Sequence, residues 1–232
     1  MTPANPQKPA ILLGIETSGD TCAVGLSREG RPLLEIAANI RNIHSRELAP
    51  FVALALEKAS LETRDISALV LSAGPGSFTG LRIGYSFAKG LAHALAAPII
   101  EVPTLDVWAY HGGARKAAIV PLIDARRGEV FCAVYRWKQG RMVQESDYTR
   151  LPIAELNGFI PEKALLSGSD AARLFPELQP HLPRGAALLQ PAPLSPPLWA
   201  LLALGFEKYR DGRFADTQSC EPLYMRTFQG AT

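Results

Sequence analysis

The chain of 232 residues has only three cysteines, and their positions argue against most cysteine chemistry. Cys22, Cys132 and Cys220 are far apart and form no CxxC pair. This usage is typical of a reduced cytoplasm and argues against both a zinc site and a disulfide framework. We therefore expect a cytoplasmic protein whose function does not depend on cysteine.

Long hydrophobic runs and an excess of one charge sign are also missing. No run of about 18 uncharged apolar residues occurs, so no membrane span is expected. Residues 1–10 are polar and proline-rich and lack the cationic start and apolar core of a signal peptide, so export is not expected. With 24 basic and 22 acidic residues and 47% hydrophobic residues, the composition predicts a soluble globular protein of one large or two small domains.

A phosphate-binding loop is missing at the place where the sequence most invites one. The corner at 74–77 (Gly-Pro-Gly-Ser) follows a predicted strand at 68–73 and precedes a predicted helix at 78–95. Glycines before a helix expose backbone N–H groups to anions. A Walker loop, however, needs Lys and then Ser or Thr after its last glycine, where this chain has Leu81 and Arg82, and the dinucleotide fingerprint needs glycine where Thr79 stands. The corner is therefore interpreted as a structural turn.

The predicted helix at 78–95 is apolar on nearly every side. At 100° per residue its polar residues fall in a stripe of roughly 60°, which leaves an apolar or small arc of roughly 300°. A helix that lies on a domain surface needs an arc only somewhat above about 100°, so several neighbours are expected. Small residues recur every four positions, which permits close backbone approach: Gly80, Gly84, Ala88 and Ala92. Packing within the domain and a partner interface both remain open.

The order of predicted elements indicates the fold class. Strands at 11–15, 21–26 and 32–40 form an antiparallel meander, and a helix capped by Ser45 runs to about residue 60. The strand at 68–73, the helix at 78–95, a strand at 98–102 and a helix at 104–110 follow. This βββαβαβα order is typical of ribonuclease-H-like α/β domains.

A second meander repeats the first. Ile15-Glu16 corresponds to Ile123-Asp124, Cys22-Ala23-Val24 to Cys132-Ala133-Val134, and Gly30-Arg31 to Gly140-Arg141, the last two at an offset of 110 residues. A repeat of this kind predicts two related half-domains. We assign 11–112 to the first and 113–226 to a reduced second, with a short strand at 164–168, a short helix at 170–178 and a final helix at 196–209 that returns to the first domain.

Two halves that each open with a strand ending in a carboxylate resemble the ATPase superfamily of actin, Hsp70 and the sugar kinases. The resemblance narrows to the bacterial TsaB (YeaZ) family. It rests on Ile15-Glu16-Thr17-Ser18, His44-Ser45, the run from Gly74 to Gly84, Ile123-Asp124-Ala125-Arg126 and Glu221-Pro222-Leu223-Tyr224-Met225-Arg226. Glu16 departs from the family pattern, in which many members carry Asp.

The resemblance implies a non-catalytic subunit without a cofactor. Proteins of this family pair with the related enzyme TsaD and the small ATPase TsaE, and the assembly transfers threonylcarbamoyl to the adenosine beside the anticodon of certain tRNAs. TsaD catalyses the transfer, and tRNA binding occurs through the complex. With the partner absent, a homodimer is expected. The candidate partner interface comprises Leu48, Phe51, Phe78, Gly80, Arg82, Ile83, Gly84 and Phe87. The helical projection places Gly84 at or beside this surface.

The residues themselves also favour an inactive site. Active ATPases of the superfamily need glycine in both hairpins so that the backbone can touch phosphate, and Ser18 and Arg126 stand there instead. Glu16 and Asp124 could hold Mg²⁺ through waters. We interpret them as vestigial carboxylates that bond to their own hairpins, with no catalytic residue and no metal site. His44 is followed four residues later by Leu48, so the His-x-x-x-His metal pair of TsaD is missing.

Three alternatives are weaker. A glycoprotein endopeptidase would need a nucleophile with a base or a metal, and an active ATPase or kinase would need the phosphate glycines. Direct RNA binding would use basic residues of the second meander, where no aromatic-rich surface is expected beside them. These residues are Arg126, Arg127, Arg136, Lys138 and Arg141.

Overall fold

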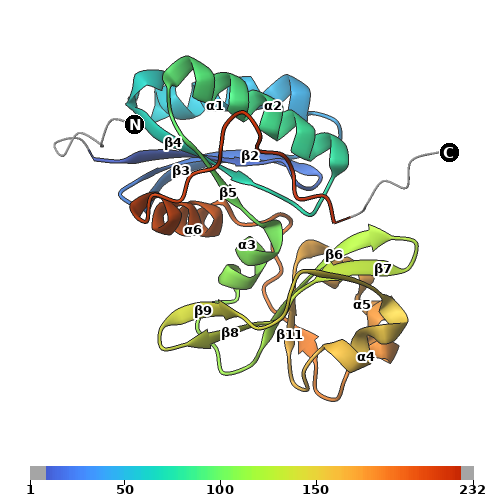
Figure 1. The fold of residues 1–232 in the computed structure, drawn as a ribbon. Helices are drawn as coiled ribbons and strands as arrows, with labels where there is room; N and C mark the ends of the chain where they lie inside the picture. Colours follow the sequence, from blue (N-terminus) through green and yellow to red (C-terminus); the bar gives the residue numbers. More distant parts are fainter. Residues whose placement is uncertain (1–8, 226–232) are drawn as a thin grey trace.

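The computed structural model describes residues 9–225 and contains two β-sheets, one in each lobe of the molecule (Figure 1). Residues 1–8 of the proline-rich start, and Arg226 of the final motif, lie outside the described residues. No helix within 9–225 is long and apolar enough to cross a bilayer.

The first sheet has the strand order β3-β2-β1-β4-β5. Its first three strands form the antiparallel meander, while β4 and β5 run parallel to β1. The predicted ribonuclease-H-like order is confirmed. The elements are β1 (Ile11–Glu16), β2 (Thr21–Arg28), β3 (Arg31–Asn39), α1 (His44–Lys58), β4 (Ile66–Ser72), α2 (Phe78–Leu95), β5 (Ile99–Val102) and α3 (Thr104–His111).

Helices cover both faces of this sheet, which explains why its central strands are continuous apolar runs. Every residue of β1 is buried, as are nearly all residues of β4. Helices α1 and α2 pack on one face, and α6 (Leu198–Arg210) packs on the other (Figure 1). Glycine lets α6 approach closely, because a Cβ atom built at Gly205 would lie 2.5 Å from the side chain of Val70.

The second sheet repeats the first. β7 and β8 pair with β6 in one continuous register, since Leu122 opposes Cys132 and Ile119 opposes Tyr135. If β7 and β8 are counted as one interrupted strand, and β9 and β10 as another, the order is β9/β10, β7/β8, β6, β11, β12. This matches the order β3-β2-β1-β4-β5 of the first lobe. The two halves are therefore related, as predicted. The strands are β6 (Ile119–Arg126), β7 (Glu129–Cys132), β8 (Tyr135–Lys138), β9 (Arg141–Gln144), β10 (Thr149–Pro152), β11 (Leu165–Ser167) and β12 (Ala187–Leu188).

The register corrects part of the predicted repeat. Glu16 opposes Ala23 in the first hairpin, and Asp124 opposes Val130 in the second, so the two carboxylates are equivalent. Counting one residue back from each partner, Cys22 then corresponds to Glu129. The predicted match of Cys22 with Cys132 is therefore wrong by three residues.

Other differences concern helices and short elements. Helix α1 begins at His44, and its N-cap residue is Ile43 without a side-chain cap, so the predicted cap at Ser45 is wrong. Strands β10 and β12 and the four-residue helix α4 (Leu156–Phe159) are not predicted from the sequence, because their apolar runs are too short for a clear period. Helix α5 (Ser169–Leu178) agrees with the prediction.

The lobes exchange their last helices. Helix α3 follows the first sheet but packs against β6 of the second, whereas α6 follows the second sheet and packs against the first. The two helices also contact each other, and both lie between the sheets (Figure 1). This exchange of α3 and α6 joins the lobes and places the end of β6 opposite the start of α2.

Candidate functional site

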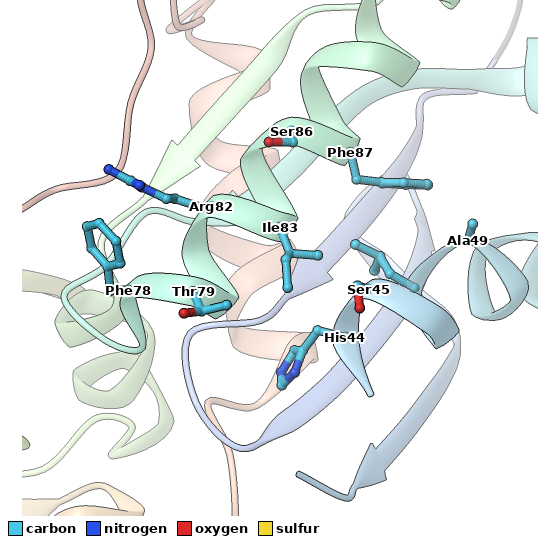
Figure 2. A pocket seen from close by; sticks show the side chains of 10 residues that line it. His44, Ser45, Ala49, Phe78, Thr79, Arg82, Ile83, Ser86 and Phe87 are labelled. Carbon is cyan, nitrogen blue, oxygen red and sulfur yellow. The ribbon is translucent and has the colours of Figure 1, made fainter. Parts of the chain in front are cut away.

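A groove lies between α1 and the first half of α2 (Figure 2). Its volume is about 470 Å³, and five of the eight predicted interface residues line it: Leu48, Phe78, Arg82, Ile83 and Phe87. Leu48 is buried at the floor, whereas Phe78 is 38% exposed at the rim. Of the remaining three, Phe51 is partly buried and packs against the core of the first lobe.

The two predicted glycines do not face a partner. Gly80 and Gly84 are buried, and a Cβ atom at either position would overlap Thr17 of the β1–β2 turn. The predicted surface position of Gly84 is therefore wrong, and the small-residue ridge serves packing within the lobe. The physical reason is that the turn crosses α2 at these positions, which a helical projection cannot show.

The other flank of α2 is covered by the end of the described chain. The backbone N–H of Leu223 donates to the carbonyl of Ala73 at 2.7 Å, and Lys89 Nζ donates to the carbonyl of Gln218 at 3.1 Å. This segment carries part of the family resemblance, but its contact with α2 is not predicted from the sequence. Since this irregular segment lies far away in sequence, no periodic signal could have indicated it.

A larger cleft of about 680 Å³ opens between the lobes. The β1–β2 turn and the start of α2 form one wall, and the end of β6 with the start of α5 forms the other. Its lining includes Asp20, Ser77, Asp124, Arg126 and Arg173. The equivalent carboxylates of the two hairpins differ in their surroundings, because Asp124 lines this cleft and Glu16 lies behind its wall.

Glu16 lies behind the cleft wall and is completely buried. Its Oε1 accepts hydrogen bonds from the backbone N–H of Ser18 at 2.6 Å and from Ser18 Oγ at 2.5 Å, and its Oε2 accepts one from Ser72 Oγ. Burial raises the pKa of Glu16 above its ordinary value, and these hydrogen bonds counteract the rise only in part.

The glycine corner packs directly onto the same hairpin. The backbone N–H of Ser77 donates to the carbonyl of Ser18 at 2.6 Å, and a Cβ atom at Gly76 would overlap that carbonyl. The start of α2 thus packs against the Ser18 carbonyl of the hairpin. This contact explains the glycine at position 76 without a phosphate.

Asp124 faces the cleft within a network of ion pairs. Its Oδ2 accepts from Arg173 Nη2 at 2.7 Å and from Arg126 Nη1 at 3.2 Å, and its Oδ1 accepts from the backbone N–H of Arg126 at 2.7 Å. Partial burial by itself would raise the pKa of Asp124, but the bonds from Arg173 and Arg126 outweigh it and hold the pKa below its ordinary value. The prediction that both carboxylates bond to their own hairpins is confirmed.

The basic residues of the second meander do not form one cluster. Arg126 and Arg127 lie at the end of β6. The other three, Arg136, Lys138 and Arg141, lie on the β8–β9 hairpin, which pairs with the start of β6. The intervening strand of seven steps spans about 23 Å. Arg136 and Lys138 both pair with Glu145. Throughout 9–225 no group of three or more His, Cys, Asp or Glu side chains is arranged to hold a metal ion.

Two lobes with the same strand order, joined by exchanged helices across a cleft, define a protein of the actin-like ATPase fold. Its first lobe is complete, and its second is reduced to shorter strands.

Comparisons with known proteins specify the family. The profile of the family TsaD, tRNA N6-adenosine threonylcarbamoyltransferase, matches residues 37–177. The tRNA threonylcarbamoyladenosine biosynthesis protein TsaB of Bacillus subtilis is 31% identical over 93% of both chains, and that of Escherichia coli is 28% identical over 93% of this chain and 94% of its own. The structure of YeaZ from Pseudomonas aeruginosa superposes with a TM-score of 0.80 at 28% identity, covering 93% of this chain and all of the other. The chain belongs to the TsaB family.

Proposed function

We propose that this protein is a non-catalytic subunit that binds TsaD and, with TsaE, supports the transfer of threonylcarbamoyl to the adenosine beside the anticodon of tRNA in the cytoplasm. Membership of the TsaB family supports a role in tRNA threonylcarbamoyladenosine biosynthesis. The observation that carries the proposal is the apolar groove between α1 and α2.

The groove has the character of a surface for a partner's helices. Ile83 and Phe87 line it and are partly buried, and Phe78 adds an exposed ring at its edge. Helix pairs pack on each other through such apolar ridges and grooves. The TsaD profile matches the region that contains α1 and α2, so TsaD has related sequence there, and a helix pair can face a helix pair. In the absence of TsaD, a second copy can occupy the groove more weakly.

The hydrogen bonds and ion pairs of the two β-hairpins favour a non-catalytic role. The backbone N–H of Ser18, the kind of group that would donate to a phosphate, donates instead to Glu16 Oε1, and Asp124 is paired with two arginines. An active ATPase of this fold needs hairpin backbone and carboxylates that are free to receive phosphate and Mg²⁺.

Calorimetric titration with purified TsaD tests the proposal. Ser86 is exposed and lines the groove, so Ser86→Trp should fill it without disturbing the core and should abolish binding. His93 is exposed two turns further along the same helix face and lies outside the groove, so His93→Trp is the matched control and should bind normally. Absence of binding by the wild type, or equal affinity of both variants, would contradict the proposal.

A further inference from the structure

Arg82 is held in a fixed position at the edge of the groove. Its guanidinium lies over the ring of Phe78, with 3.8 Å from Cζ to the ring centroid, and its Nε donates to the hydroxyl of Tyr224 at 3.1 Å. Figure 2 shows Arg82 and Phe78 together on the side of α2 that faces away from Ser45 and Ala49 of α1. The side chain is exposed but is restrained on two sides, by a ring face and by a hydrogen bond.

No carboxylate of the described chain neutralises this arginine. The ten residues that line the groove include no Asp or Glu. Arg126, Arg136 and Arg173 all form ion pairs, whereas no carboxylate in 9–225 pairs with Arg82. The hydrogen bond to Tyr224 uses Nε, and neither terminal nitrogen of Arg82 donates to another residue within 9–225.

We propose that Arg82 binds a carboxylate of the partner, an Asp or Glu side chain set within an otherwise apolar contact surface. This inference rests on the proposed function, because it names the chemistry that the partner presents at the groove. A guanidinium is a planar fork that matches a carboxylate with two parallel hydrogen bonds, and stacking on Phe78 orients the fork before the partner arrives. Tyr224 is then a positioning residue, which acts on the partner through Arg82.

The same charge distribution favours a different chain over a second copy. A two-fold symmetric contact brings identical surfaces together, so each group must find its complement on the same patch. This patch offers one cation and no anion, and two copies would bury Arg82 without a carboxylate. Burial of an unpaired charge is unfavourable, whereas a partner with a carboxylate in register satisfies it.

The test is calorimetric titration of the full chain with TsaD at low and high sodium chloride, about 50 and 300 mM, a range over which screening of an ion pair changes strongly. Arg82→Gln should weaken binding about tenfold or more at low salt, as expected when one partner of an interfacial charge pair is removed. It should also remove most of the salt dependence. Arg82→Lys should be intermediate, because the ammonium keeps the charge but loses the fork.

Lys89→Gln is the matched control. Lys89 is on the same helix and has the same charge, but it bonds to the carbonyl of Gln218 and does not line the groove. This variant should keep the wild-type affinity and salt dependence. Tyr224→Phe should keep the fold and show a smaller loss in the same direction as Arg82→Gln, because it frees the guanidinium to rotate.

The outcomes separate this inference from the proposed function. If the wild type binds TsaD but Arg82→Gln binds within about twofold of it, a difference well below the tenfold step of 1.4 kcal/mol, the inference fails and the proposed function stands. An equal loss of salt dependence in Lys89→Gln would also overturn the inference. If the wild type does not bind TsaD at all, the proposed function fails and takes this inference with it.

Discussion

The backbone N–H of Ser77 donates a hydrogen bond of 2.6 Å to the carbonyl of Ser18, so the start of α2 closes over the first β-hairpin. Glycine at position 76 makes this contact possible, because any side chain there would overlap the Ser18 carbonyl. In an active ATPase of this fold, the corresponding hairpin receives phosphate. Here the N–H of Ser18 donates to Glu16 and its carbonyl accepts from Ser77, so both backbone groups stabilise the wall of the cleft.

We expect no steady hydrolysis of ATP by the purified protein, because the backbone N–H of Ser18 in the first hairpin is bonded to Glu16 and Asp124 is paired with Arg126 and Arg173. Phosphate release with Mg²⁺ and ATP should equal the buffer blank. Glu16→Ala and Asp124→Ala are the controls for a contaminating enzyme and should give the same blank rate. Release that is lost in either variant would show that the cleft is catalytic.

A side chain at position 84 should destabilise the folded protein. A Cβ atom there overlaps Thr17 Oγ1, so Gly84→Ala should lower the free energy of unfolding by about 1–3 kcal/mol, the usual cost of overfilling a packed contact. Gly90 lies on the same helix with open space around it, and Gly90→Ala should raise stability by about 0.5–1 kcal/mol through helix propensity. Urea unfolding monitored by circular dichroism measures both.

A second substitution checks the cause of the Gly84 effect. Thr17→Ala removes the overlapping hydroxyl, so the double variant with Gly84→Ala should be more stable than the sum of the single effects predicts. Strict additivity would mean that Thr17 is not the obstacle.

Stability should fall with rising pH because of Glu16. Its pKa in the folded protein is raised by burial, so the folded state holds a proton that the unfolded chain releases near pH 4.5. Linkage then makes Glu16 lower the free energy of unfolding as the pH rises from the unfolded pKa to the folded pKa. Glu16→Gln, which stays neutral, should lose this slope and be more stable than the wild type at neutral pH.

Asp124 gives the opposite contribution, which serves as the internal control. Its folded pKa is lowered, so its stabilisation is present above the unfolded value of 3.8 and is lost as the pH falls through the folded pKa. Asp124→Asn should therefore be less stable than the wild type at neutral pH and should converge with it in acid. Urea unfolding between pH 3 and 8, a range chosen to bracket ordinary carboxyl pKa values, measures both slopes. Parallel curves for wild type and Glu16→Gln would contradict the prediction.

Much of the fold could be read from local patterns. Helix α2 agrees with the predicted helix at both ends, Phe78 and Leu95, because its apolar residues and the glycine corner before it are local signals. The short strands β10 and β12 were missed, since three or four residues carry no clear period. Five of the eight predicted interface residues line one groove between α1 and α2, and their contact with a partner stays a prediction.

The sequence by itself determined the order of the elements, the relation between the two lobes and the equivalence of Glu16 with Asp124. These follow from periodicity and from residues that are near each other in the chain. Tertiary structure alone decided that Gly84 faces Thr17, that Tyr224 holds Arg82, and that Cys22 and Cys132 are out of register. Periodicity fixes the direction in which a side chain points around its own helix or strand. It does not say which distant segment lies in that direction, because that depends on how loops and lobes pack together.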